Sequence, residues 1–210
     1  MLDNPNHKNS PGKNFEDSAE LLINKFSISY LINPEKRYED VYELYIKSAN
    51  AYKLDNLWEK AGDVYLKAGN YIWTNPYDGI FSVGTNFETI QCFINGAHCY
   101  DKIKHEKRIE CRTNAISLYK ISGQFERCGK LYLQIAEIYE YNNQIELALE
   151  NYNHAHQFFE LSEKGKTDSI QCLCKYANLY ASKSEKINLN KLLDIYNKII
   201  DCYQTINTGK

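Results

Sequence analysis

Proline and glycine are scarce in this chain of 210 residues, which holds only 4 Pro and 10 Gly. Both residues interrupt helices, so their scarcity predicts long helices. Long apolar runs are missing too, because no stretch approaches the ~18 residues that a membrane-spanning helix needs. The chain also lacks a charge excess, since its formal net charge is -2. This balance disfavours nucleic acid as the main ligand, because binding phosphates requires a positive surface.

Cysteine motifs are absent although the chain contains 7 Cys. The number is odd, and no two cysteines have the Cys-x-x-Cys spacing. Cys92 and Cys99 share one face of an expected helix, but seven residues of helix separate them beyond disulfide distance. We therefore interpret the cysteines as buried, reduced thiols of a cytoplasmic protein.

Residue pairs that suggest a metal site have the wrong spacing for one. His154 and His156 lie two residues apart on an expected helix, where their side chains point in different directions. The same holds for Cys172 and Cys174. The segment Glu163-Lys-Gly-Lys-Thr resembles a phosphate-binding loop only in its last residues and lacks the first glycine. The sequence therefore predicts no catalytic residue, no metal and no cofactor, and the hypothesis of a helical-repeat enzyme is weak.

What the chain does contain is a repeated two-helix unit marked by tyrosine. Four segments carry the pattern Ala-x-x-Tyr, which ends at Tyr52, Tyr100, Tyr139 and Tyr180. The second helix of each unit has a tyrosine of its own, at Tyr65, Tyr119, Tyr152 and Tyr196. A period of roughly 40 residues built from two helices is the signature of a solenoid. The sequence thus predicts an all-α, right-handed solenoid of antiparallel TPR-like helical hairpins, with tyrosine rings between helices and hydroxyls at the surface.

Composition and helix breakers set the expected boundaries. Residues 1–14 are predicted to be a disordered N-terminal arm, residues 15–205 the repeat domain, and residues 206–210 a frayed end. The expected hairpins cover 37–53 with 57–72, 86–103 with 106–121, 125–141 with 144–161, and 168–183 with 188–204. Residues 73–85 contain Pro and two Gly, which predicts a loop.

An apolar segment lies ahead of the first hairpin and is expected to end at Pro34. Its apolar residues are Phe26, Ile28, Tyr30, Leu31 and Ile32. One interpretation buries the segment as the end of a helix. The other exposes it as a loop that dips into a bilayer or contacts a partner. The residues alone leave both interpretations open.

Six blocks of residues occur in the order that is typical of one family. They are Tyr38–Lys53, Trp58–Ala68, Ala115–Phe125, Ile135–Glu140, Ile145–Tyr152 and Asp194–Tyr196. Together they resemble the soluble NSF attachment proteins of vesicle fusion (the SNAP adaptors), and the alpha type more than the gamma type. The block Ile-Ala-Glu-Ile-Tyr-Glu is fairly specific.

This resemblance implies a non-enzymatic adaptor in vesicle-mediated protein transport and membrane fusion. Its partners in the family are the SNARE four-helix bundle and the AAA+ ATPase NSF, which pulls the bundle apart. The resemblance also implies a cytoplasmic, peripheral membrane protein, with the segment Phe26–Ile32 at the position of the family's membrane-contact loop. Family members continue with a C-terminal bundle that engages the ATPase, and nothing in this chain matches that part.

The resemblance assigns SNARE binding to two basic residues, Lys102 and Lys130. Three further positions, where basic residues are typical of the family, hold Asn56, Gln124 and Gln171 instead. The alternative function is a general TPR-type peptide-binding scaffold or co-chaperone. That class predicts a repeated clamp of Lys, Arg and Asn, which we do not find, and a shorter repeat period.

Overall fold

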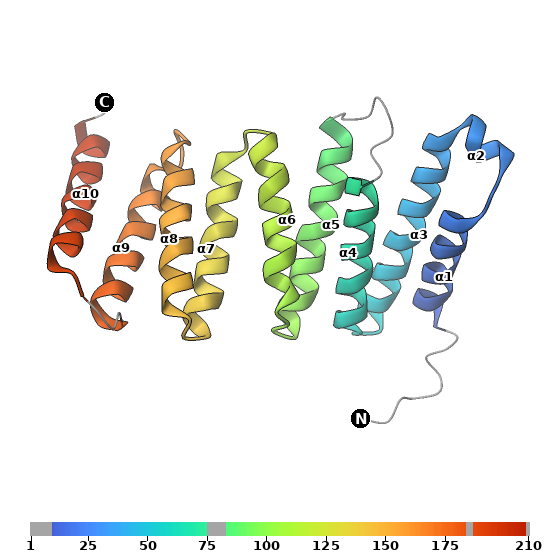
Figure 1. Cartoon of the computed structure of the whole chain (residues 1–210), viewed down its shortest axis with the longest axis horizontal. Helices are drawn as coiled ribbons and strands as arrows, with labels where there is room; N and C mark the ends of the chain where they lie inside the picture. Colours follow the sequence, from blue (N-terminus) through green and yellow to red (C-terminus); the bar gives the residue numbers. More distant parts are fainter. Residues whose placement is uncertain (1–9, 75–82, 184–186, 209–210) are drawn as a thin grey trace, which may run out of the picture. The chain divides into compact units, whose positions relative to one another are not determined.

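The computed structural model describes residues 10–74, 83–183 and 187–208, and every regular element within these ranges is an α-helix (Figure 1). The helices are α1 Pro11–Asn24, α2 Ile28–Ile32, α3 Pro34–Leu54, α4 Trp58–Thr74, α5 Val83–Lys102, α6 Lys107–Ile121, α7 Phe125–Tyr141, α8 Ile145–Glu160, α9 Lys166–Lys183 and α10 Leu189–Thr208. The predicted all-α class is therefore confirmed.

The helices form two compact units, residues 1–115 (unit 1) and residues 116–210 (unit 2), with the boundary inside α6. In unit 1, α3 packs between α1 and α4, and α4 packs against α5. In unit 2, α8 packs between α7 and α9, and α9 packs against α10. Consecutive long helices of each unit run in opposite directions, so each unit is a stack of hairpins (Figure 1). No helix in the described ranges is long and apolar enough to cross a membrane.

The helix bounds differ from several of the expected boundaries. Helix α1 begins at Pro11, within the predicted arm, because Ser10 caps it by accepting a hydrogen bond from the backbone N–H of Lys13. Pro34 begins α3 instead of ending a loop, since Asn33 caps this helix in the same way. Helix α10 continues through residue 208 because the first helix breaker is Gly209. Residues 1–9, 75–82, 184–186 and 209–210 lie outside the described residues.

The repeated tyrosines mark the ends of helices. In four turns, the backbone carbonyl of a tyrosine accepts a 2.9 Å hydrogen bond from the N–H five residues later. These tyrosines are Tyr52, Tyr100, Tyr119 and Tyr139. The residue four positions after each of them has a positive φ, namely Asn56, Lys104, Gly123 and Asn143. This is the geometry of a Schellman motif, which satisfies the last carbonyls of a helix and reverses the chain into the next one.

The tyrosine rings also form much of the core. Tyr52, Tyr100 and Tyr152 are at most 1% exposed. Each hydroxyl donates a hydrogen bond to a carboxylate on a neighbouring helix, from Tyr52 to Glu16, from Tyr100 to Asp63 and from Tyr152 to Glu140. Burial, followed by these carboxylates, raises the pKa of all three phenols. The prediction that rings lie between helices is confirmed, and these three hydroxyls end on carboxylates.

Candidate interaction surfaces

The apolar segment of unit 1 is exposed, which excludes the interpretation that buries it as the end of a helix. Phe26 is 79% exposed and Ile32 is 80% exposed, and Ile28 and Leu31 also face solvent. The segment is not a loop throughout, because its second half forms the short helix α2. Monomeric proteins rarely gather large apolar side chains on a protruding element unless that element contacts something.

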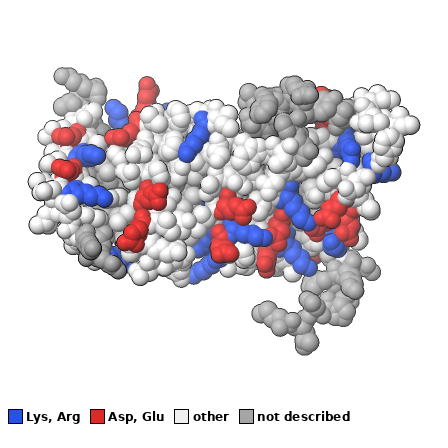
Figure 2. All heavy atoms as spheres, in the orientation of Figure 1, with Lys and Arg blue, Asp and Glu red and all other residues white. Residues whose placement is uncertain are grey.

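Polar contacts hold this exposed segment in place. The Tyr30 hydroxyl donates a 3.0 Å hydrogen bond to Asp40 of α3, so Tyr30 is half-buried and anchors α2. The Arg37 guanidinium of α3 donates to the carbonyls of Leu22 and Ile23 near the end of α1. The end of the molecule formed by α2 is nearly free of charged atoms in the view of Figure 2. The segment is therefore a fixed apolar projection, with Tyr30 as its attachment.

Lys102 and Lys130 lie in different units and differ in their surroundings. Lys102 is exposed at the end of α5 in unit 1, with its ammonium 6.0 Å from the centre of the Trp58 ring. Among the described residues, no carboxylate lies within ion-pair distance of it. Lys130 of α7 is exposed in unit 2 and is 2.6 Å from Glu126, one helical turn away. Lys102 can thus pair with an external anion directly, whereas Lys130 must first give up its ion pair with Glu126.

The residues at the three non-basic positions have local structural roles or are exposed. Asn56 has φ 58°, a conformation that Asn adopts more readily than Lys does. Gln124 is the N-cap residue of α7, and its N–H makes the turn bond to the Tyr119 carbonyl. Gln171 is exposed on α9. The backbone at position 56 thus favours Asn without requiring it, since Lys104 adopts the same conformation at the equivalent turn.

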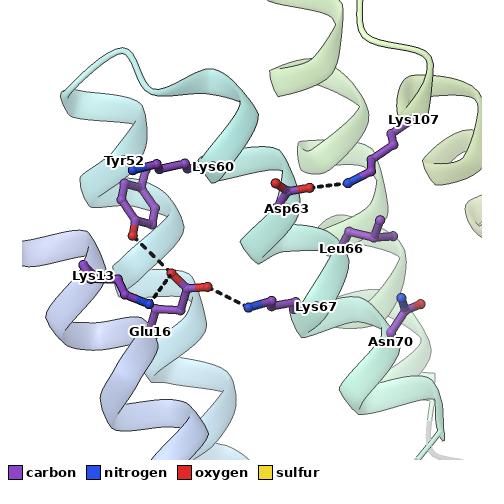
Figure 3. Close-up of a pocket in the computed structure, with 9 residues that line it drawn as sticks. All are labelled: Lys13, Glu16, Tyr52, Lys60, Asp63, Leu66, Lys67, Asn70 and Lys107. Atoms are coloured by element: carbon purple, nitrogen blue, oxygen red, sulfur yellow. Dashed lines mark hydrogen bonds and ion pairs between the residues drawn. The ribbon is translucent and has the colours of Figure 1, made fainter. Parts of the chain in front are cut away.

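A surface depression of about 540 Å³ lies in unit 1 and is lined by residues of α1, α3, α4 and the start of α6 (Figure 3). Its lining residues are Lys13, Glu16, Tyr52, Lys60, Asp63, Leu66, Lys67, Asn70 and Lys107. Sequence reasoning missed this site, because its residues come from segments far apart in the chain and form no motif. Figure 2 shows acidic and basic side chains interspersed over unit 1.

Two lysines of the depression form ion pairs with nearby carboxylates. Lys67 lies 2.7 Å from Glu16 and 2.8 Å from Glu20. Burial lowers the pKa of Lys67, but the hydrogen bonds to the two carboxylates outweigh burial and raise its pKa overall. Lys107 lies 2.6 Å from Asp63. Burial raises the pKa of Asp63, and the stronger combined effect of Lys107 and the Tyr100 hydroxyl lowers it.

The depression is therefore a network that joins helices rather than a reactive site. Glu16 connects α1 to the Tyr52 hydroxyl of α3 and to Lys67 of α4. Asp63 connects α4 to the Tyr100 hydroxyl of α5 and to Lys107 of α6. Each of these partly exposed pairs contributes little to stability, but together they link five helices.

The histidine and cysteine pairs considered for a metal do not form a cluster. Within the described part of the chain, no group of three potential metal ligands occurs. His154 packs on the Tyr132 ring at 5.0 Å, whereas His156 is buried and its Nδ1 lies 2.7 Å from the Ser169 hydroxyl of α9. Burial lowers the pKa of His156, so the ring favours its neutral form. Burial raises the pKa of the Cys172 thiol to about 12, which keeps it protonated and unreactive.

These features define a class: a helical-repeat protein whose exposed apolar and basic residues offer surfaces for other molecules. The family model described as "Soluble NSF attachment protein, SNAP" matches residues 10–210. The chain therefore belongs to the soluble NSF attachment protein (SNAP) family.

Individual relatives agree with this assignment. The alpha-soluble NSF attachment protein of Vitis vinifera is 30% identical, over 93% of this chain and 59% of its own length. The human alpha-soluble NSF attachment protein is 26% identical, over 86% of this chain and 55% of its own. A soluble NSF attachment protein homolog of fowlpox virus is 30% identical, over 83% and 57% respectively. The chain thus spans somewhat more than half the length of these relatives.

A solved structure confirms the architecture at the level of fold. BtubC (BKLC) from P. vanneervenii superposes with a TM-score of 0.51 over 81% of this chain and 66% of its own. The two sequences are 13% identical, so this likeness concerns the fold alone.

Proposed function

We propose that this chain is a SNAP-type adaptor of vesicle fusion, which binds SNARE four-helix bundles at a membrane and has no catalytic activity of its own. The observation that carries the proposal is the family match over residues 10–210, combined with a fixed apolar projection at Phe26–Ile32. Family membership also supports an NSF-type AAA+ ATPase as the second partner and a cytoplasmic, peripheral membrane location. These partners are the ones that the resemblance of the sequence implies.

The SNARE half of the proposal predicts unequal effects of the two lysines. A SNARE bundle is acidic, so Lys102→Glu replaces an attraction to the bundle by a repulsion. Lys130→Glu does the same, but Lys130 also pairs with Glu126, and this pair competes with binding to the bundle. We expect Lys102→Glu to weaken capture of the chain by an immobilised, assembled SNARE complex roughly tenfold, and Lys130→Glu less. Pull-down at two salt concentrations measures this, because screening reduces the contribution of exposed charges.

Lys36→Glu is the matched control, since Lys36 is an exposed lysine at the start of α3 and has no assigned role. Equal losses for all three variants would assign the effect to net charge alone. Failure of the unaltered chain to bind the SNARE complex would refute the function itself.

The membrane half predicts that the apolar projection provides the binding energy for lipid. Replacing Phe26 and Leu31 together by Ser removes two large exposed apolar side chains. Burial of each in a bilayer contributes about 1.5–3 kcal/mol, so liposome partitioning falls by a hundredfold or more. Co-flotation with liposomes measures the effect. The control is Leu54→Ser, because Leu54 is equally exposed but lies at the opposite end of α3; a similar loss in this variant would contradict the prediction.

A further inference from the structure

Two exposed aromatic side chains of unit 1 lie outside the apolar projection at residues 26–32. Trp73, in the last turn of α4, is 39% exposed, and Phe87, near the start of α5, is 57% exposed. The Trp73 ring packs edge-on against Phe93 of α5, with the ring centres 5.8 Å apart. The ring is thus held in place while part of it faces solvent. Single exposed apolar side chains are common, so what matters is where these two lie.

Both aromatic side chains lie toward one end of the α4–α5 pair. Gly69 of α4 faces Phe93 of α5, because a Cβ at Gly69 would lie 2.7 Å from the Phe93 ring. Trp73 comes four residues after Gly69, about 6 Å further along α4. Phe87 comes six residues before Phe93, about 9 Å back along α5. The two helices run in opposite directions, so both displacements point toward the same end of unit 1, which is the upper end in Figure 1.

The apolar projection is attached to this same end. Tyr38, near the start of α3, stacks on Tyr71, near the end of α4, with the ring centres 5.9 Å apart. The start of α3 therefore lies beside the end of α4. Helix α2 directly precedes α3 and is tied to it by the hydrogen bond from Tyr30 to Asp40. Figure 1 shows α2 at the same end of unit 1 as the start of α3 and the end of α4.

Six exposed apolar side chains thus share one end of unit 1, which we call the apolar end. They are Phe26, Ile28, Leu31, Ile32, Trp73 and Phe87. They come from separate elements, whereas a partner helix or strand binds to a single groove or edge. A flat surface can meet projections from several elements at once. Tryptophan beside apolar side chains is typical of the boundary between lipid headgroups and acyl chains, where the ring is buried and the N–H stays hydrated.

We propose that the apolar end contacts a lipid bilayer at two places, with Trp73 and Phe87 forming a second contact beside the segment Phe26–Ile32. This second contact rests on the membrane half of the proposed function and extends it to α4 and α5. A single projection is one attachment about which unit 1 can turn. A second contact on the same end limits the tilt of unit 1 relative to the bilayer and so orients the helices that carry the other binding surfaces.

The two tryptophans of the chain provide a direct test, because Trp58 and Trp73 lie at opposite ends of α4, about 22 Å apart along the helix. Trp58→Phe leaves Trp73 as the only tryptophan, and Trp73→Phe leaves Trp58. Each variant is mixed with liposomes of phosphatidylcholine and phosphatidylserine, with and without bromine on the acyl chains. We expect the emission of Trp73 to shift to shorter wavelength on plain liposomes and to be quenched by the brominated ones. The emission of Trp58 should change in neither case.

Co-flotation with the plain liposomes measures how much the second contact contributes to binding. We expect Phe87→Ser to lower partitioning roughly tenfold, because it removes one large exposed apolar side chain. Leu54→Ser is the matched control, since Leu54 is more exposed than Phe87 but lies at the opposite end of α3, and it should change partitioning little. Far-UV circular dichroism verifies that both variants keep the helical content of the unaltered chain.

The outcomes separate the second contact from the proposed function. If the unaltered chain does not bind liposomes, both are wrong. If it binds and the double replacement of Phe26 and Leu31 by Ser abolishes binding, the membrane half of the proposed function stands. The second contact is then overturned if Trp73 is not quenched and Phe87→Ser binds as the unaltered chain does. Equal quenching of Trp58 and Trp73, or an equal loss in Leu54→Ser, would overturn it too, because adsorption would then be unspecific.

Discussion

Replacing Gly165 by Ala should destabilise unit 2 by about 3 kcal/mol, because there is no space for a methyl group at this turn. A Cβ at this position would lie 2.4 Å from the backbone carbonyl oxygen of Phe159. Backbone atoms cannot rotate away as the end of a side chain can, so α8 and α9 would have to separate. The Gly165 carbonyl also accepts a 2.8 Å hydrogen bond from the N–H of Ser169 in the first turns of α9.

Urea unfolding followed by far-UV circular dichroism measures this effect, and a loss of this size lowers the midpoint by about 1 M. Gly123→Ala is the control, since Gly123 has a φ of +67° and no atom within 4 Å of an added Cβ. That variant has a conformational cost of about 1 kcal/mol without a clash. If both variants lose the same stability, the close approach at Gly165 does not matter.

Gly165 also explains a motif that the sequence leaves ambiguous. In the segment 163–167, the glycine could be interpreted as the remnant of a phosphate-binding loop. The structure shows a connection between α8 and α9 in which the backbone of Gly165 approaches that of Phe159. A sequence shows that a glycine is present, but the contact that requires it involves the backbone of a residue in the preceding helix.

The long helices were predictable because their signal is local. Each hairpin carries an apolar stripe at helical spacing. Three of the four positive-φ turn positions hold Asn or Gly, which tolerate that conformation, and the fourth holds Lys104. The signal for the N-cap at Ser10 is equally local, because Ser followed by Pro is typical of the start of a helix. At this end of the chain, the capping signal of Ser10 and Pro11 outweighs the polar composition of the segment.

The interaction surfaces were predictable only in part, because exposure depends on packing between distant segments. The sequence showed that Phe26 and Ile32 are apolar, but their exposure depends on how α1, α2 and α3 meet. The depression around Glu16 and Lys67 joins residues far apart in the chain, so no spacing rule could indicate it.

Replacing Tyr100 by Ala should destabilise unit 1 by about 3–5 kcal/mol, the range for removing a buried aromatic side chain. The Tyr100 ring is fully buried, and it lies so close to Gly62 of α4 that a Cβ there would be 2.8 Å from it. Removing the ring leaves a cavity at the junction of α4 and α5, which cannot close without moving both helices.

Tyr100→Phe separates the ring from the hydroxyl. This variant keeps the contact with Gly62 and loses only the 2.6 Å hydrogen bond to Asp63, which retains Lys107 as a partner. We expect a loss of about 1 kcal/mol, since the carboxylate is partly solvated. Tyr141→Ala, at an exposed tyrosine of α7, should change the urea midpoint little. If Tyr100→Phe destabilises the protein as much as Tyr100→Ala does, the ion-pair network around Asp63, rather than packing of the repeated tyrosine, stabilises this junction.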